Sequence, residues 1–140
     1  MLSLQNLSDR IEIQDLLTRY CHAIDQRDWD ALDEIFTPDA HIDFTATGGI
    51  AGQLSEIKPF LESAIPLFKS IQHFVTNPLL DIDGDRATAR SLLLNPCTMA
   101  RESGDHTLFI GAWYVDELMR QPDGWRISSR RQEKSFFHNQ

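Results

Sequence analysis

The chain has 140 residues and a net charge of −8 at pH 7. Hydrophobic residues make up 41% of it and charged residues 24%, proportions that are ordinary for a globular protein and exclude a disordered chain or a coiled coil. The length predicts one domain over residues 1–140. The acidic balance argues against a nucleic-acid partner, whose phosphates attract basic proteins.

Targeting signals are not expected. The longest stretch without an acidic or basic residue, 44–55, is too short to span a membrane. The first ten residues lack the basic segment and apolar run of a secretory signal. The cysteines, Cys21 and Cys97, are too few for a disulfide framework, so the interpretation is reduced thiols in a cytoplasmic protein.

The first predicted element is a long helix. Apolar residues recur at helical spacing from Ile13 to Ile24, and Ser8 is the expected N-cap. Asp25 then lies at the edge of the buried stripe, near the helix end. A short second helix, capped by Asp28, is expected to close with a turn at 37–39.

A strand and a third helix follow. The alternation over 41–45 predicts a strand with Phe44 on its apolar face. Ser55 is the expected start of the next helix, with Pro59 in its first turn and Pro66 at its end.

The rest of the chain reads as β-structure. Asp83-Gly84 and the turn at 122–124 mark hairpins, and interruptions are expected at Asn77-Pro78 and Asn95-Pro96. The expected strands cover residues 71–82, 87–100, 106–119 and 125–133. This order predicts an α+β fold, with helices on one side of a curved antiparallel sheet.

These features together resemble the SnoaL-like branch of the nuclear-transport-factor-2-like superfamily. The resemblance rests on Tyr20-x-x-x-x-Asp25 with Arg27-Asp28-Trp29-Asp30-Ala31-Leu32, on Pro38-Asp39-Ala40, on His73-Phe74-Val75-Thr76-Asn77, and on the hairpins Asp83-Gly84-Asp85 and Asp123-Gly124-Trp125. It implies a cone-shaped, strongly curved mixed or antiparallel sheet wrapped around the N-terminal helices, with an apolar pocket. Members include scytalone dehydratase, lindane dehydrochlorinase and non-enzymatic binding proteins, so the fold alone does not set the function.

The resemblance also implies site residues. In the dehydratase and dehydrochlorinase type, an Asp at the end of the first helix orients a His that removes a proton; the matching residues are Asp25 and His73. An Arg five residues after the last hairpin Trp corresponds to Arg130. The dehydrochlorinase has a Lys where this chain has Tyr20, so a halide leaving group lacks its cation and that substrate is not expected.

The residues themselves leave alternatives open. His73 alternates with apolar Ile71 and Val75, which suits either a half-buried base or a core histidine. Asp25 is either its partner or an exposed helix-end residue. Tyr20 either contacts substrate or packs in the core, and Arg130 binds an anion or forms a salt bridge.

Two aromatic residues complete the expected pocket. Phe44 and Trp113 are assigned to its wall, although Trp113 and Tyr114 alternate and one of them must face outward. His41, Asp43 and His73 do not have the spacing of a metal site, and no phosphate loop, dinucleotide fingerprint or zinc motif is present. Neither a metal nor a cofactor is therefore expected.

Two function classes remain. The first is a cofactor-independent lyase, eliminating water or halide, or an isomerase, acting on a small, apolar, cyclic or aromatic molecule through a His–Asp dyad. The second is a non-catalytic ligand-binding protein or a scaffold subunit of a ring-hydroxylating dioxygenase. In either case a homodimer or homotrimer is expected.

Overall fold

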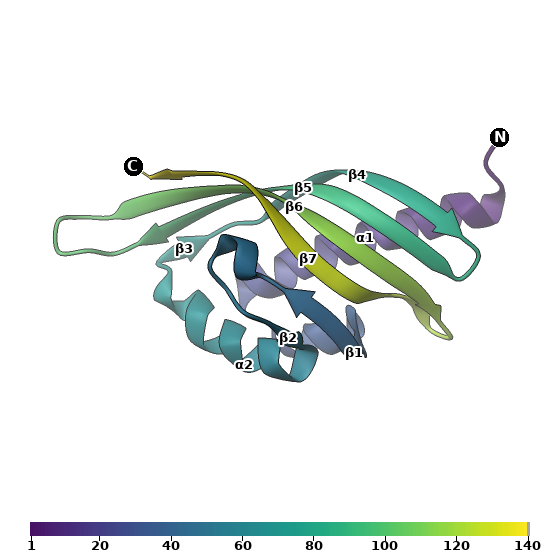
Figure 1. Ribbon diagram of the computed structural model, residues 1–140, viewed down its shortest axis with the longest axis horizontal. Coiled ribbons are helices and arrows are strands. Elements are labelled where there is room, and N and C mark those ends of the chain that lie inside the picture. Colours follow the sequence, from purple (N-terminus) through teal and green to yellow (C-terminus); the bar gives the residue numbers. More distant parts are fainter. Residues whose placement is uncertain (140) are drawn as a thin grey trace.

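The computed structural model describes residues 1–139 (Figure 1). Within them no helix is long and apolar enough to cross a membrane. The α-helices and strands, with three short 3-10 helices (η), are α1 (Leu4–Gln26), η1 (Asp30–Glu34), β1 (Phe36–Asp43), η2 (Thr45–Thr47), β2 (Ala51–Gln53), α2 (Leu54–Ala64), η3 (Ile65–Leu67), β3 (Ser70–Ile71), β4 (Phe74–Asp83), β5 (Arg86–Met99), β6 (His106–Gln121) and β7 (Gly124–Asn139).

One mixed sheet of seven strands organises the molecule. Its order is β2-β1-β7-β6-β5-β3, and β4 also pairs with β5. Only β1 and β7 pair in parallel within this sheet; the other neighbours are antiparallel. The sheet bends over α1 and α2 without closing (Figure 1), which confirms the predicted α+β class and the curved, mixed sheet.

Helix α1 packs its apolar stripe against the sheet. Ile13 and Leu16 are completely buried, as the helical spacing predicts. The helix starts earlier than expected, because the Ser3 hydroxyl rather than that of Ser8 accepts the N-terminal hydrogen bond. It ends at Gln26, and the left-handed backbone of the C-cap residue Arg27 (φ 60°) then turns the chain.

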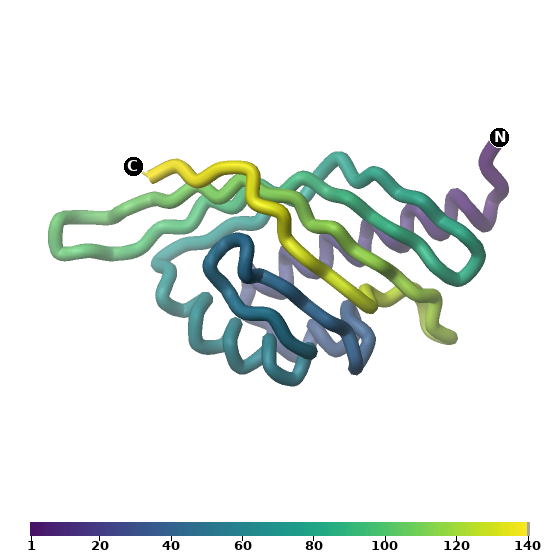
Figure 2. Tube along the Cα trace, viewed as in Figure 1, coloured from purple at the N-terminus to yellow at the C-terminus, as the bar shows by residue number. Residues whose placement is uncertain are grey.

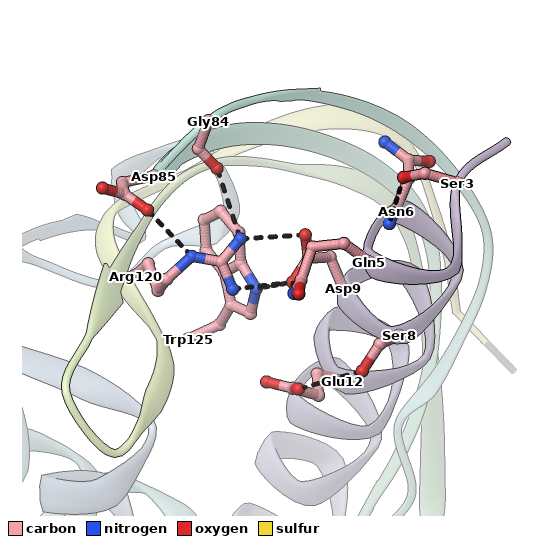
Figure 3. A network of polar contacts seen from close by, with 10 residues as sticks. All are labelled: Ser3, Gln5, Asn6, Ser8, Asp9, Glu12, Gly84, Asp85, Arg120 and Trp125. Carbon is pink, nitrogen blue, oxygen red and sulfur yellow. Dashed lines mark hydrogen bonds and ion pairs between the residues drawn. The ribbon is translucent and has the colours of Figure 1, made fainter.

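A partly buried ion pair joins the N-terminal half of α1 to the β6–β7 end of the sheet (Figure 3). Arg120 of β6 donates from both terminal nitrogens to the two carboxylate oxygens of Asp9, at 2.7 and 2.8 Å. The indole of Trp125 also donates to Asp9, at 3.1 Å, and its ring lies 4.6 Å from the Arg120 guanidinium. These contacts set the helix direction and therefore where its other end, with Asp25, lies.

The second helix differs from the prediction at its start. It begins at Leu54, and Gln53 and Glu56 form a reciprocal capping box in place of the expected Ser55 cap. Pro59 consequently lies in the second turn rather than the first. Pro66 ends the helix as predicted, and the chain continues as η3.

The strands show two further differences. The expected turn at 37–39 lies inside β1, where the pairing with β7 shifts register between Phe36 and His41. The expected break at Asn95-Pro96 does not occur, because β5 runs unbroken from Arg86 to Met99 and its partner is interrupted instead, between β3 and β4. Figure 2 shows the β5–β6 loop extending past the body beside the C-terminal strand, far from the N-terminus.

Candidate functional site

The end of α1 and the break between β3 and β4 bring Asp25 and His73 together. Asp25 Oδ1 lies 2.6 Å from His73 Nδ1, and Asp25 Oδ2 accepts the His73 backbone N–H at 3.0 Å. One carboxylate thus fixes both the main chain and the ring of His73. The Asp25 side chain is 23% exposed and that of His73 is 7% exposed, so the pair is largely shielded from water.

This pairing determines what the imidazole can do. An ionised carboxylate is only an acceptor, so the hydrogen between the two groups belongs to Nδ1. The Nε2 atom of the neutral ring then carries a free lone pair. A lone pair held in place by an oriented, hydrogen-bonded ring is the requirement for a general base.

His73 lies in the wall of a cavity of about 240 Å³ beneath the curved sheet. The cavity walls are mostly aliphatic and aromatic, and they come from both helices and from β5 and β6. The apolar lining includes Ile24, Phe44, Phe60, Phe68, Ile71 and Ile110. No Asp, Glu, Lys or Arg is among its lining residues within 1–139. Such a cavity suits a small, uncharged and largely apolar molecule.

Two tyrosines contribute hydroxyl groups to this lining. Tyr20 and Tyr114 both line the cavity, with their ring centroids 5.7 Å apart and nearly perpendicular. Burial raises the pKa of Tyr20 above its ordinary value and raises that of Tyr114 further. Both phenols therefore stay protonated at neutral pH.

Arg130 lies behind the tyrosines, not in the cavity. Its guanidinium is fully buried and binds both oxygens of Asp116, at 2.7 and 2.8 Å. Its central carbon lies 4.3 Å from the Tyr20 ring centre and 3.9 Å from that of Tyr114. The expectation that Arg130 contacts a substrate is therefore corrected: the two rings cover its charge and Asp116 pairs with it, while its Nη1 atom has no hydrogen-bond partner within residues 1–139.

Of the two remaining candidates from the sequence, Phe44 lies in the cavity wall and Trp113 lies outside it. Phe44 lines the cavity and is 5% exposed, because the strand alternation turns it inward with Ala40 and Ile42. Trp113 does not line the cavity, which corrects its assignment to the wall. The alternation of β6 turns Trp113 to the opposite face of the sheet, where the Arg90 guanidinium lies 5.0 Å from its ring centre.

Sequence reasoning missed three polar residues of the lining, which are Asn95, Thr47 and Gln132. Asn95 and Cys97 point inward from β5, and Thr47 donates a hydrogen bond to Gln132 across the cavity edge. Asn95 adjoins Pro96, where the sequence indicated a break, so a signal existed at that position. Burial, with a smaller effect of the Asp25 charge, raises the pKa of Cys97 to about 11, so this thiol is a poor nucleophile at neutral pH.

Comparison with known proteins places this geometry in context. The family model described as SnoaL-like domain matches residues 5–131. An uncharacterized protein of Mycobacterium tuberculosis is 46% identical over 136 residues, which cover 97% of this chain and 92% of that protein. A gamma-hexachlorocyclohexane dehydrochlorinase of Sphingobium indicum is 25% identical over 138 residues, which cover 98% and 87% of the two chains.

A solved structure supports the same relationship. The crystal structure of a protein from Kribbella flavida superposes with a TM-score of 0.85 at 28% identity and covers 94% of this chain and 93% of that chain. The likeness therefore extends over nearly the whole fold.

Proposed function

The chain belongs to the SnoaL-like domain family, and from that premise we propose that it is a cofactor-independent lyase that removes water from a small, uncharged cyclic or aromatic substrate. One observation carries the proposal. A carboxylate-bound histidine faces an apolar cavity whose lining, within residues 1–139, holds phenols and amides but no charged acid or base.

The proposed reaction uses three side chains. His73 Nε2 takes a proton from a carbon atom of the substrate, and the electrons of that bond form the new double bond as a neighbouring carbon–oxygen bond breaks. Tyr20 donates a hydrogen bond to the departing oxygen, and Asp25 stabilises the imidazolium. The imidazolium then returns its proton to the departing hydroxide, which leaves as water. A related isomerisation would return the proton to another carbon instead.

The leaving group follows from the cavity chemistry. A halide leaves as an anion and is stabilised by a cation, whereas a hydroxyl group needs a hydrogen-bond donor and a proton. Arg130 is covered by two rings, while Tyr20 and Tyr114 are protonated phenols in the wall. We therefore propose water rather than chloride as the leaving group, although the dehydrochlorinase relative is named for loss of hydrogen chloride.

A screen for stabilising ligands tests the proposal. Cyclic ketones, phenols, polyketide fragments and halogenated rings are screened by thermal shift, because a ligand that binds the native state raises its melting temperature. A hit is then incubated with the wild type and assayed for product. We expect His73→Ala to bind the hit but to lose turnover, and Asp25→Asn to reduce turnover by about 100-fold or more.

The control is His41→Ala, which changes an exposed histidine of β1 outside the cavity and should leave turnover unchanged. Unchanged turnover in His73→Ala would refute the assignment of the base. Hits that bind wild type and His73→Ala equally and are never converted would favour the alternative, a ligand-binding or scaffold protein.

We also infer that the outer face of the sheet binds a second copy of this chain. Phe74, Leu94, Gly111 and Phe136 are direct partners across four neighbouring strands. The three apolar side chains of this row are 41–51% exposed, and the Phe136 ring lies over Gly111, within 2.0 Å of where a Cβ atom would stand. An exposed apolar row of this kind is typical of an interface.

Sedimentation velocity tests this inference. We expect the wild type to sediment as a dimer or trimer and Leu94→Glu to shift it toward the monomer. Leu4→Glu places the same charge on an exposed apolar residue of α1 and should not change the mass. A monomeric wild type, or a Leu94→Glu variant that stays assembled, would contradict the inference.

The proposed compartment is the cytoplasm, which suits the two free, buried cysteines.

A further inference from the structure

The main chain at His73 departs from regular sheet pairing. β3 and the first part of β4, as far as Thr76, pair with β5 in one continuous register, with Ile71 opposite Cys97 and Phe74 opposite Leu94. In this register Gln72 stands opposite Pro96, and His73 stands opposite Asn95. Neither Gln72 nor His73 belongs to a strand, although strands adjoin them on both sides.

Pro96 explains part of this departure. In an antiparallel ladder, residues of a hydrogen-bonded pair exchange two bonds. Gln72 donates its N–H to the Pro96 carbonyl at 3.2 Å. The returning bond cannot form, because proline has no N–H. A proline inside a central strand therefore leaves the Gln72 carbonyl without its ladder partner.

The Asn95 side chain supplies the missing donor. Its Nδ2 atom donates to the Gln72 carbonyl at 2.6 Å, and its Oδ1 atom accepts from the Cys97 thiol at 3.3 Å. The Asn95 side chain is buried, so an unpaired amide there would be costly. The thiol contact leaves Nδ2 directed at Gln72.

The next residue along the chain is turned the other way. Because the backbone N–H groups of successive residues point to opposite sides of a strand, the His73 N–H faces away from β5. Asp25 accepts its hydrogen bond. The peptide between Gln72 and His73 is thus held from both sides, by Asn95 through the Gln72 carbonyl and by Asp25 through the His73 N–H. Removal of either contact frees this peptide and with it the direction of the imidazole.

We propose that Asn95 is a positioning residue for His73, acting through the Gln72 carbonyl in place of the N–H that Pro96 lacks. The role in turnover rests on the proposed function, whereas the bracing itself does not. An asparagine at a cavity wall would ordinarily be assigned to substrate binding. Here one N–H of its amide and its Oδ1 atom are already used within the protein.

Amide hydrogen exchange and imidazole nitrogen NMR test the proposal in four variants compared with the wild type. We expect Asn95→Ala to speed exchange of the His73 amide roughly fivefold to tenfold, which corresponds to the loss of one hydrogen bond, and to reduce the Nδ1–H form of its ring. Pro96→Ala restores a backbone donor to Gln72, so it should stay within about twofold of wild type. The double variant Asn95→Ala/Pro96→Ala should likewise recover to within about twofold.

Ser91→Ala is the matched control, since Ser91 is a fully buried polar residue of the same strand whose hydroxyl has no partner within residues 1–139. It should change neither readout. The proposal is overturned if the His73 amide exchanges at the wild-type rate in Asn95→Ala. It is also overturned if this amide exchanges as fast in the double variant as in Asn95→Ala. If Asn95→Ala does not fold, the double variant decides, because only the proposed replacement of the donor restores it.

The two proposals fail separately. If the four variants behave as expected but no substrate is converted, the bracing stands and the proposed lyase fails. If turnover depends on His73 while Asn95→Ala keeps wild-type exchange, only the positioning role is lost.

Discussion

Replacement of Asp9 by Asn should lower the free energy of unfolding by about 2.5 kcal/mol at pH 7. Hydrogen bonds from Arg120, and secondarily from Trp125 and Gln5, outweigh the effect of burial and lower the pKa of Asp9 from 3.8 to about 2. Each tenfold change in acid strength is worth about 1.4 kcal/mol, which gives the stated value. The carboxylate is almost completely buried, so solvent screens it little.

The pH dependence identifies the cause. Because the folded-state pKa lies below the unfolded one, the stabilisation is fully present above about pH 4 and is lost as the pH falls toward 2. Urea unfolding of wild type and Asp9→Asn is compared from pH 7 to pH 3, where the difference should fall by about half. Asp85→Asn removes the exposed partner of the same Arg120 and should cost less than about 1 kcal/mol. An Asp9→Asn effect that is equal at both pH values, or below that of Asp85→Asn, would refute the reasoning.

Three further outcomes are expected. Arg130→Met alone should lower the unfolding free energy by about 3–5 kcal/mol in urea titrations, because it leaves Asp116 charged and buried; combining it with Asp116→Leu should recover part of the loss. The Cys97 thiol, with its pKa near 11, should react with a disulfide reagent at pH 8 far more slowly in the native protein than in urea. Gly49→Ala should cost about 1–3 kcal/mol, because its Cβ would lie 2.7 Å from that of Phe44; equal stability would mean that the loop moves freely.

Helical periodicity was the most informative part of the sequence. The stripe through α1 places Tyr20 inward and Asp25 at its edge, and the structure has both there. The apolar alternation beside His73 likewise indicated an inward ring. The resemblance, rather than the spacing, connected Asp25 with His73, since no local pattern joins residues 48 positions apart.

The strand faces were harder to predict. Alternation states that Trp113 and Tyr114 face opposite ways, but it does not state which one is inside. The same holds for Arg130 and Arg131, of which Arg130 is inside. Although Arg130 faces inward, it does not line the cavity, because the rings of Tyr20 and Tyr114 lie between its guanidinium and the cavity. These rings come from α1 and β6, and strand alternation in β7 cannot predict their position.

The prolines of the strands locate the places where the sheet deviates from regular pairing, although not the form of each deviation. Pro38 lies where β1 shifts register against β7, and Pro78 lies in the shift of β4 between Thr76 and Leu79. Pro96 leaves its own strand intact and transfers the irregularity to the partner, at Gln72 and His73. Each proline lacks the N–H that would donate to a carbonyl of the neighbouring strand. That carbonyl must therefore find another donor, or the pairing is interrupted there. Opposite Pro96, the Asn95 side chain donates the hydrogen bond that the Gln72 carbonyl would otherwise lack. The missing ladder bond is thereby replaced by a contact that holds the main chain next to His73.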